Sequence, residues 1–256
     1  MRIATWNVNS LSARLAKVEE WIDYASPDIL CMQETKVADG AFPTMVFSAL
    51  GYETASHGDG RWNGVALASR VGLEEIQRGF VTGADEQGCR LLSATCGGAR
   101  VHSVYVPNGR SVDSEHYVAK LAWLNELRAH LEQTCKPAED IAVCGDFNVA
   151  PEDRDVWDPA ACHGATHVTG PEREALRDIE DWGLEDAFRI HYQQPSLFSW
   201  WDYRAGNFHK HLGMRIDLVL LSRTLAERSI YALIDRNARK GKAPSDHAPL
   251  FVDVSP

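Results

Sequence analysis

Hydrophobic and polar positions alternate along the chain in short blocks that predict strands and helices in turn. Residues 2–8 have the pattern of a strand. Residues 11–25 place apolar side chains on one helical face, with Ser10 as a candidate N-cap. Residues 29–33 then form a short apolar run that predicts a second strand. The N-terminal part therefore begins as strand, helix and strand.

The rest of the chain continues this alternation. From about residue 45 we expect strand after strand, with Gly97-Gly98 as a two-residue hairpin signal. Two further amphipathic helices are predicted, at 117–131 and at 171–182. The other predicted strands are 65–69, 90–95, 100–106, 141–144, 216–222, 229–235 and 248–254.

The order of these elements favours an α/β class and one domain over residues 1–256, because no linker rich in Pro, Gly or Ser interrupts it. Two predicted strands each deliver an acidic residue at their carboxyl end, Glu34 and Asp146. In layered α/β proteins such strand ends bind ligands. The pattern points to two sheets with carboxylates meeting at one rim.

Six short polar segments interrupt the apolar pattern, and nearly all follow a predicted strand. Any one of them is most simply a turn, but six with matching chemistry predict a shared site. They supply carboxylates, amides, a phenol and an imidazole, a set that suits Mg²⁺ or Mn²⁺ and disfavours zinc. The segments are Asn7-Val8-Asn9, Gln33-Glu34-Thr35-Lys36, Tyr105-Val106-Pro107-Asn108-Gly109, Gly145-Asp146-Phe147-Asn148, Arg215-Ile216-Asp217 and Ser245-Asp246-His247.

Net charge at first argues against a DNA partner. The chain has 26 Lys+Arg and 36 Asp+Glu, a formal net charge of −10, and polyanions are repelled by such a balance. However, residues 151–186 hold 11 acidic and 3 basic residues, whereas residues 199–256 hold 9 basic and 6 acidic ones. DNA therefore remains a candidate partner, and we expect residues 153–186 to face mostly away from the duplex.

Cysteine usage and hydropathy suggest where the protein acts. The six cysteines lack metal-binding spacing and several lie in apolar runs, which indicates reduced thiols and a cytoplasmic protein. Residues 1–7 enter a strand pattern directly, so we expect no signal peptide. No apolar run approaches the ~18 residues that a membrane span needs. We expect a monomer with no membrane partner.

In this order, the six segments resemble the exonuclease III family of class II AP (abasic-site) endonucleases. That family lies in the endonuclease/exonuclease/phosphatase superfamily with the DNase I-like fold. The resemblance implies a four-layer α/β sandwich, with two mixed β-sheets flanked by helices and the site at one end. It also implies Mg²⁺ (or Mn²⁺) and double-stranded DNA with abasic sites or 3′ ends. Further matching stretches are Trp62-Asn63-Gly64-Val65-Ala66 and Phe198-Ser199-Trp200-Trp201-Asp202-Tyr203-Arg204.

Phosphodiester hydrolysis and the resemblance together suggest roles for the polar residues. Glu34 is expected to bind the metal, while Asp146 orients and deprotonates water and Asn148 donates to a phosphate oxygen. His247 is expected to donate to the phosphate as a cation, and the resemblance places Asp217 behind its ring. The catalytic candidates are Tyr105, Asp146, Asn148, Asp217 and His247. The metal-binding candidates are Asn7, Glu34, Asp146, Asn148, Asp246 and His247.

Some residues keep an alternative interpretation. Asp217 could instead be a strand carboxylate paired with Arg215. Asn9 stands where some relatives carry a metal-binding aspartate, so we expect weaker metal binding there. The loop 199–215 is expected to contact DNA and to help form a small apolar pocket for a flipped abasic sugar, near Phe198. Alternatively, one of its two tryptophans is core. The substrate-binding candidates are Asn9, Lys36, Asn108, Trp200, Trp201, Arg204 and Met214.

Three functions remain open. The first is a Mg²⁺-dependent DNA-repair phosphodiesterase of exodeoxyribonuclease III type, which incises duplex DNA 5′ to abasic sites and removes 3′ blocking groups or 3′ nucleotides. The second is a 3′→5′ exonuclease or 3′ phosphatase with weak incision of abasic sites. The third is a non-catalytic nucleic-acid-binding member of the superfamily. The last is disfavoured because the chain carries the full set of catalytic candidates.

Overall fold

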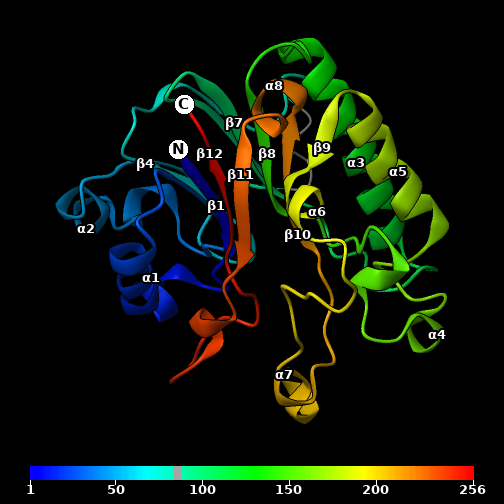
Figure 1. Cartoon of the computed structure of the whole chain (residues 1–256). Helices are drawn as coiled ribbons and strands as arrows, with labels where there is room; N and C mark the ends of the chain where they lie inside the picture. Colours follow the sequence, from blue (N-terminus) through cyan, green and yellow to red (C-terminus); the bar gives the residue numbers. More distant parts are fainter. Residues whose placement is uncertain (84–87) are drawn as a thin grey trace.

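The computed structural model describes residues 1–83 and 88–256. Two six-stranded sheets lie face to face, with helices on their outer sides (Figure 1). Sheet 1 has the order β11-β12-β1-β2-β4-β3, and sheet 2 has the order β5-β6-β7-β8-β10-β9. Each sheet contains one parallel pair among antiparallel pairs. The predicted four-layer α/β sandwich is confirmed.

The elements have the following bounds. Sheet 1 contains β1 (Arg2–Asn7), β2 (Ile29–Gln33), β3 (Glu53–His57), β4 (Val65–Ser69), β11 (Ser229–Ile234) and β12 (Leu250–Val254). Sheet 2 contains β5 (Glu74–Arg78), β6 (Leu91–Cys96), β7 (Ala99–Tyr105), β8 (Ile141–Asp146), β9 (Leu184–Asp186) and β10 (Asp217–Ser222). The α-helices are α1 (Leu11–Ala25), α2 (Thr44–Ala49), α3 (Glu115–Thr134), α4 (Pro159–Cys162), α5 (Gly170–Asp181), α6 (Ala187–His191), α7 (Asn207–Lys210) and α8 (Arg223–Ala226).

Two local predictions need correction. Ser10 precedes α1, but its side chain makes no capping hydrogen bond. Instead, the amides of Ser10 and Leu11 donate to the carbonyls of Glu34 and Thr35, at 2.7 and 2.9 Å. The segment after residue 45 is also not strand alone, since α2 comes first. Tertiary contacts replace a local cap, and they tie the start of α1 to the loop that carries Glu34.

The core lies between the sheets and under the helices. Side chains from sheet 1, such as Cys31 and Leu67, pack against side chains from sheet 2, such as Val101 and Cys144. A second cluster lies between sheet 2 and helices α3 and α5, which cover its outer face in Figure 1. Strands buried on both faces explain the nearly continuous apolar runs in the sequence. Among the described residues, none of the helices combines the length and the apolar content that crossing a membrane requires.

Strand register brings the polar strand ends together. In sheet 2, Asp146 lies opposite Tyr105 on one side and Asp217 on the other. In sheet 1, Asn7 lies opposite Gln33, the residue before Glu34. Both groups lie at the end of the sandwich that is lowest in Figure 1, where α7 projects below β10. The fold therefore gathers at one end residues that are far apart in the sequence.

A buried ion pair fixes the loops beside this end. Lys120 of α3 and Glu172 of α5 are fully buried and in contact. Lys120 also donates to the carbonyl of Asn148 at 2.6 Å. Glu172 accepts from the amide of His167 at 2.9 Å and forms a capping box with Thr169 at the start of α5. One salt bridge thus joins two helices to the segment that follows β8.

Replacement of Lys120 alone should destabilise the fold strongly, because Glu172 would keep a buried charge without its cation. We expect Lys120→Met to lower the free energy of unfolding by about 3–5 kcal/mol, measured by urea unfolding at neutral pH. The double variant Lys120→Met/Glu172→Gln should recover at least half of that loss. A single variant within about 1 kcal/mol of wild type would contradict this assignment.

Candidate active site

Two carboxylates and an imidazole converge at the lower end of the sandwich. Ligand atoms of Glu34, Asp146 and His247 lie within 4.8 Å of one another. Glu34 follows β2 in sheet 1, Asp146 ends β8 in sheet 2, and His247 precedes β12. Asn7 joins the two sheets, since its side-chain nitrogen donates to Glu34 Oε1 and to Asp146 Oδ2, each at 2.9 Å. The site is therefore built across the gap between the sheets.

Several site residues adopt left-handed backbone conformations. The φ angles are 43° for Asn9, 48° for Glu34, 52° for Lys36 and 50° for Asn148. Such angles are unfavourable for residues other than glycine and persist where surrounding contacts impose them. For example, the amide of Lys36 donates to the carbonyl of Asn63 at 2.9 Å. These sharp turns direct the side chains that follow each strand toward the site.

Asp217 lies directly behind the ring of His247. Its carboxylate oxygens are 2.9 and 3.1 Å from His247 Nδ1, and Ser199 Oγ donates to Oδ2 at 2.6 Å. The alternative pairing of Asp217 with Arg215 is wrong. Arg215 instead contacts Asp155 at 2.7 Å, and a second carboxylate occupies another of its nitrogens. Asp217 is consequently free to orient His247.

Burial and charge set the protonation states of the cluster. Burial alone lowers the pKa of His247, but the carboxylates of Asp217 and Asp146 outweigh it and raise that pKa to about 10. Burial raises the pKa of Asp146 to about 7, while nearby His247 acts in the opposite direction. His247 Nε2 lies 3.8 Å from Asp146 Oδ2. At neutral pH the site therefore holds an imidazolium beside a carboxyl group that titrates near neutrality.

Tyr105 completes the cluster as a hydrogen-bond donor. Burial, followed by the charges of Glu34 and Asp146, raises its pKa well above the ordinary value, so the phenol stays protonated. The Arg90 guanidinium lies 4.5 Å from the Tyr105 ring centroid, and Nη1 donates to the Tyr105 carbonyl at 3.2 Å. Sequence reasoning missed Arg90. Its only signal was a cation as the first residue of the predicted strand 90–95, a pattern that also fits a solvated strand end.

A second ring of residues surrounds the cluster. Lys36 Nζ lies 2.9 Å from Glu34 Oε2 and donates to Asn9 Oδ1 at 2.7 Å. Asn9 Nδ2 donates to Asp246 Oδ1 at 2.9 Å, and Trp200 Nε1 donates to Asp246 Oδ2 at 3.1 Å. Asn9 therefore bridges a cation and a carboxylate. Asp246 is not among the three residues whose ligand atoms converge, and it belongs to the ring of residues around them.

The amides around the cluster are held by their own hydrogen bonds. The backbone of Asn148 donates to Asp146 Oδ1 at 2.9 Å, and its side-chain nitrogen donates to the Val106 carbonyl at 2.9 Å. Asn108 donates from its side chain to Asn148 Oδ1 at 3.2 Å. Asn7 Oδ1 accepts from the amide of Asn9 at 3.0 Å. The bonds to Val106 and Asn108 hold Asn148 against the loop after β7.

The donors present fit a divalent cation with oxygen preference. The carboxylates of Glu34 and Asp146 converge, and buried carboxylates gain most from a neighbouring cation. As an imidazolium, His247 offers no free nitrogen lone pair to the ion. Burial is the main cause of the raised pKa of Asp146, and the carboxylates of Asp217 and Glu34 add to it, so a bound cation would stabilise the ionised form. Glu34 and Asp146 are the residues that could hold the ion directly. Asn7, Asn148 and Asp246 remain predicted ligands.

The loop predicted to contact substrate, residues 199–215 (the substrate loop), has exposed and buried parts. Trp200 is partly buried and pairs through its backbone with Met214 and with His247. Arg204 is exposed and forms an ion pair with Asp202. The prediction that Trp201 contacts substrate is wrong, because its side chain is fully buried. The alternative in which one tryptophan is core is therefore correct, and hydropathy alone could not distinguish two adjacent tryptophans.

The region around the predicted sugar pocket shows a similar division. Phe198 has an exposed fraction of 1% and packs against His211, with ring centroids 4.8 Å apart. Met214 lies between Trp200 and Val156, with which it also forms a β-bridge. The exposed part of this region is thus formed around Trp200 and Met214. Phe198 supports it from within the core.

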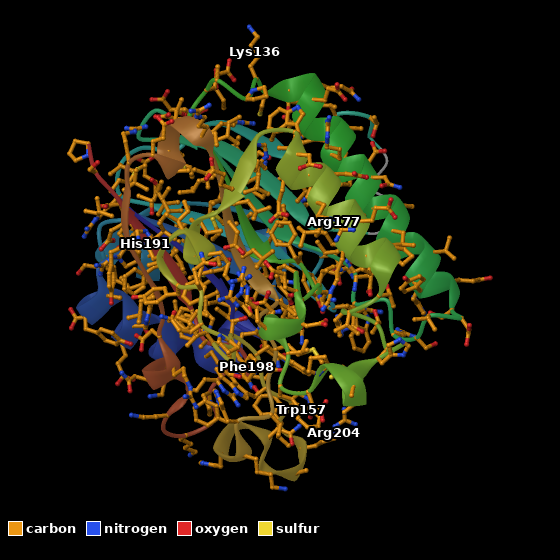
Figure 2. The ribbon with its side chains drawn as sticks, turned by 45° about the vertical axis from the view of Figure 1, so that its right-hand side comes forward. Lys136, Trp157, Arg177, His191, Phe198 and Arg204 are labelled. Atoms are coloured by element: carbon orange, nitrogen blue, oxygen red, sulfur yellow. The ribbon has the colours of Figure 1, made fainter. Side chains whose placement is uncertain are left out.

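The acidic segment lies mostly on the flank of the molecule. Figure 2 shows Arg177 of α5 on the outer side, whereas Trp157 and Arg204 lie at the lower end. The amide of Trp157 donates to the carbonyl of Gly213 at 3.0 Å, so residues 156–157 border the substrate loop. Part of the acidic charge is internal, since Asp155 is fully buried and ion-paired. Helix α5 thus lies on the flank, whereas residues 156–157 border the substrate loop. The orientation of residues 153–186 relative to a duplex stays a prediction.

The sequence matches a known protein family over most of its length. The sequence profile of the Endonuclease/Exonuclease/phosphatase family matches residues 4–247. The chain is 34% identical to exodeoxyribonuclease III of Haemophilus influenzae, over 99% of both chains. The chain belongs to the endonuclease/exonuclease/phosphatase family. Its resemblance to the exonuclease III branch is thereby confirmed.

Solved structures of this family have the same fold over the whole chain. An AP endonuclease from Archaeoglobus fulgidus has a TM-score of 0.97 and 36% sequence identity, with 100% of both chains covered. A 3′ phosphatase from Neisseria, NExo, solved with a product DNA hairpin, has a TM-score of 0.96 and 34% identity. That comparison covers 100% of this chain and 99% of the other. The predicted DNase I-like fold is therefore confirmed.

The protonation of His247 can be tested directly. Asp217→Asn should lower the pKa of His247 by about 1–3 pH units, because the ring loses an adjacent negative charge. NMR titration of the imidazole in EDTA measures this change. Asp253→Asn, which removes an ion pair with Arg2 outside the cluster, should leave the titration unchanged. Equal midpoints for His247 in wild type and Asp217→Asn would contradict the assignment.

The protonation of His247 also makes the free energy of unfolding depend on pH in a predictable direction. The pKa of His247 rises from 6.5 to about 10 on folding, so its contribution to stability is complete below pH 6.5 and is lost as pH rises through about 10. In Asp217→Asn this loss should occur at lower pH. Urea unfolding of both proteins between about pH 7.5 and 10, where Asp146 is largely ionised, measures the difference. Parallel stability curves over this range would contradict it.

Proposed function

We propose that this protein is a Mg²⁺-dependent phosphodiesterase of exodeoxyribonuclease III type. It incises duplex DNA 5′ to abasic sites and removes 3′ blocking groups or 3′ nucleotides. The observation that carries this proposal is the cluster in which Glu34 and Asp146 face a cationic His247 backed by Asp217. This set provides a base, a cation and a metal-binding carboxylate at one point, which phosphodiester hydrolysis needs.

Residues of the chain supply the acid–base chemistry. A Mg²⁺ (or Mn²⁺) ion held by Glu34 and Asp146 would neutralise phosphate charge and stabilise the leaving oxygen. Asp146, whose pKa of about 7 suits a general base, orients and deprotonates the attacking water. His247 donates from Nε2 to a phosphate oxygen, and Asp217 keeps it protonated. Tyr105 is a further donor because its phenol stays protonated.

Residues around the cluster would bind the duplex. Lys36 and Asn9 lie on the side of Glu34, Asn108 lies beside Asn148, and Trp200 with Met214 borders His247. Arg204, which is exposed on the substrate loop beside Asp202, would contact a phosphate. Buried cysteines that form no disulfide, namely Cys31, Cys96, Cys135, Cys144 and Cys162, fit a protein of the cytoplasm. We further propose that the protein acts as a monomer.

A second candidate is a 3′ phosphatase or 3′→5′ exonuclease with weak incision of abasic sites. It is favoured by the Neisseria 3′ phosphatase, which matches this fold about as closely as the archaeal AP endonuclease does. Both reactions use attack of water on a phosphate 3′ of a sugar, so the same cluster serves either one. They differ in whether the duplex must admit an internal abasic nucleotide or only a 3′ end.

Incision is tested with a duplex that contains a tetrahydrofuran abasic analogue. We expect Mg²⁺-dependent cleavage 5′ to the analogue, and no cleavage in EDTA. Asp146→Asn should lower the rate by about 10²–10⁴-fold, because the general base is lost. Asp178→Lys reverses a charge on the exposed side of α5 and should cleave at nearly the wild-type rate. Metal-loaded wild type that binds this duplex but leaves it intact would refute incision.

The two candidate activities are separated by their rates on two substrates. The wild-type enzyme is compared on the abasic duplex and on a nicked duplex with a 3′-phosphate, under identical Mg²⁺ and salt. A faster rate on the abasic duplex supports the first candidate. Release of phosphate with little incision supports the second. Metal-independent binding with no turnover of either substrate would instead support a non-catalytic role.

A further inference from the structure

The substrate loop and the catalytic histidine are connected by one buried arginine. Arg239 ends the 3₁₀-helix η4 (Arg236–Arg239), and only 7% of its surface is exposed. Its guanidinium carbon lies 4.8 Å from the ring centroid of Phe208, 5.4 Å from that of Tyr203 and 5.9 Å from that of Trp201. All three rings belong to residues 200–212, named here the aromatic loop. The cation is therefore enclosed by aromatic rings of the aromatic loop, which favour it through their quadrupoles.

The other contact of Arg239 is with the segment that carries His247. Its Nη1 donates to the carbonyl of Ser245. Ser245 Oγ in turn accepts from the amide of His247 at 3.1 Å and donates to the carbonyl of Asn7 at 2.6 Å. Ser245 thus holds the backbone of His247 against the end of β1. A displacement of Arg239 would be transmitted to both residues through Ser245.

Further hydrogen bonds join the aromatic loop to residues 244–247. The amide of Trp201 donates to the carbonyl of Asp246 at 3.1 Å, and Tyr203 Oη donates to the carbonyl of Pro244 at 2.7 Å. These bonds hold the aromatic loop beside residues 244–247. Arg239 adds a charged side chain that contacts both segments at once. Because its guanidinium is buried, it cannot itself follow the phosphates of a duplex.

We propose that Arg239 is a positioning residue that couples the aromatic loop to the Ser245-Asp246-His247 segment. Contacts of Trp200 and its neighbours with DNA would hold the aromatic loop, and the guanidinium would transfer that constraint to the backbone of His247. The inference rests on the proposed function for its catalytic consequence. Its structural part, the restraint of residues 245–248, is independent of which DNA substrate is cleaved.

Arg236 provides a matched control. Its guanidinium carbon lies 5.2 Å from the ring centroids of both Trp201 and Phe208, so it stacks on two of the same rings. Within the described ranges, however, no hydrogen bond joins its side chain to residues 245–247. Arg236→Met and Arg239→Met each remove one cation from this aromatic group and retain a linear apolar side chain. Only the second removes the bond to Ser245.

The test compares both variants with wild type by steady-state kinetics on the better of the two DNA substrates. Arg239→Met should lower kcat by about 10–100-fold, because small displacements of a catalytic group are costly. Its KM should change less than about threefold, since the phosphate and loop contacts remain. Arg236→Met should keep kcat within about twofold of wild type. Urea unfolding of each variant shows whether either change follows from stability.

Hydrogen exchange supplies a measurement that does not require activity. In the free protein, the amides of His247 and Ala248 donate to Ser245 Oγ and to the Ser199 carbonyl, at 3.1 and 2.7 Å. Arg239→Met should accelerate exchange in the peptide that spans 244–250 by about tenfold. Arg236→Met should leave this peptide at the wild-type rate. Mass spectrometry of pepsin fragments measures both.

The outcomes distinguish this inference from the proposed function. Wild-type kcat and exchange in Arg239→Met would overturn the coupling. Equal losses of kcat in both variants would also overturn it, because they would show that ring packing alone matters. If wild-type enzyme turns over neither DNA substrate, the proposed function is wrong, and the exchange comparison still decides whether Arg239 restrains the His247 segment.

Discussion

The structure depends on how buried negative charge is compensated at the end of the sandwich. Asp146 and Asp217 lie side by side on neighbouring strands, and neither is more than 1% exposed. Two such carboxylates would repel each other in a medium of low polarity. His247 lies against Asp217 and within 3.8 Å of Asp146, and its raised pKa keeps it charged. The cation that compensates the buried acids is therefore the same group that we propose as the donor to the phosphate.

The two sheets contribute unequal parts to this arrangement. Sheet 2 supplies the buried acids on adjacent strands, while sheet 1 supplies Glu34 and the amide of Asn7 that reaches across to Asp146. A close-packed core between the sheets prevents them from sliding, so the distance between the two carboxylates is set by packing. Loops alone could not hold such groups to within a fraction of an ångström. The rigid sandwich makes a preorganised site possible.

The loops that surround the site are tied to it by internal cations. Lys120 is fully buried and holds the carbonyl of Asn148, and Arg239 holds the carbonyl of Ser245. Each cation has partners on more than one segment, either a carboxylate or aromatic rings. Several positive charges therefore lie inside the molecule and interact with internal groups. This explains why a simple count of charges along the chain gives a poor estimate of the charge on its surface.

Local pattern was sufficient for much of the architecture. Apolar runs and helical periodicity predicted α1 and β2 with their observed bounds. Polar residues at the ends of strands marked Glu34 and Asp146, and those directly before the last strand marked His247, because side-chain chemistry and strand ends are local properties. Three features became evident only in the folded protein: Trp201 is a core residue, Arg239 is buried, and the Arg90 guanidinium lies on the Tyr105 ring. Those outcomes depend on which distant segments pack together. The order of amino acids specifies which chemical groups lie at the strand ends, whereas folding specifies the neighbours of those groups, because burial and charge pairing depend on contacts between residues far apart in the chain.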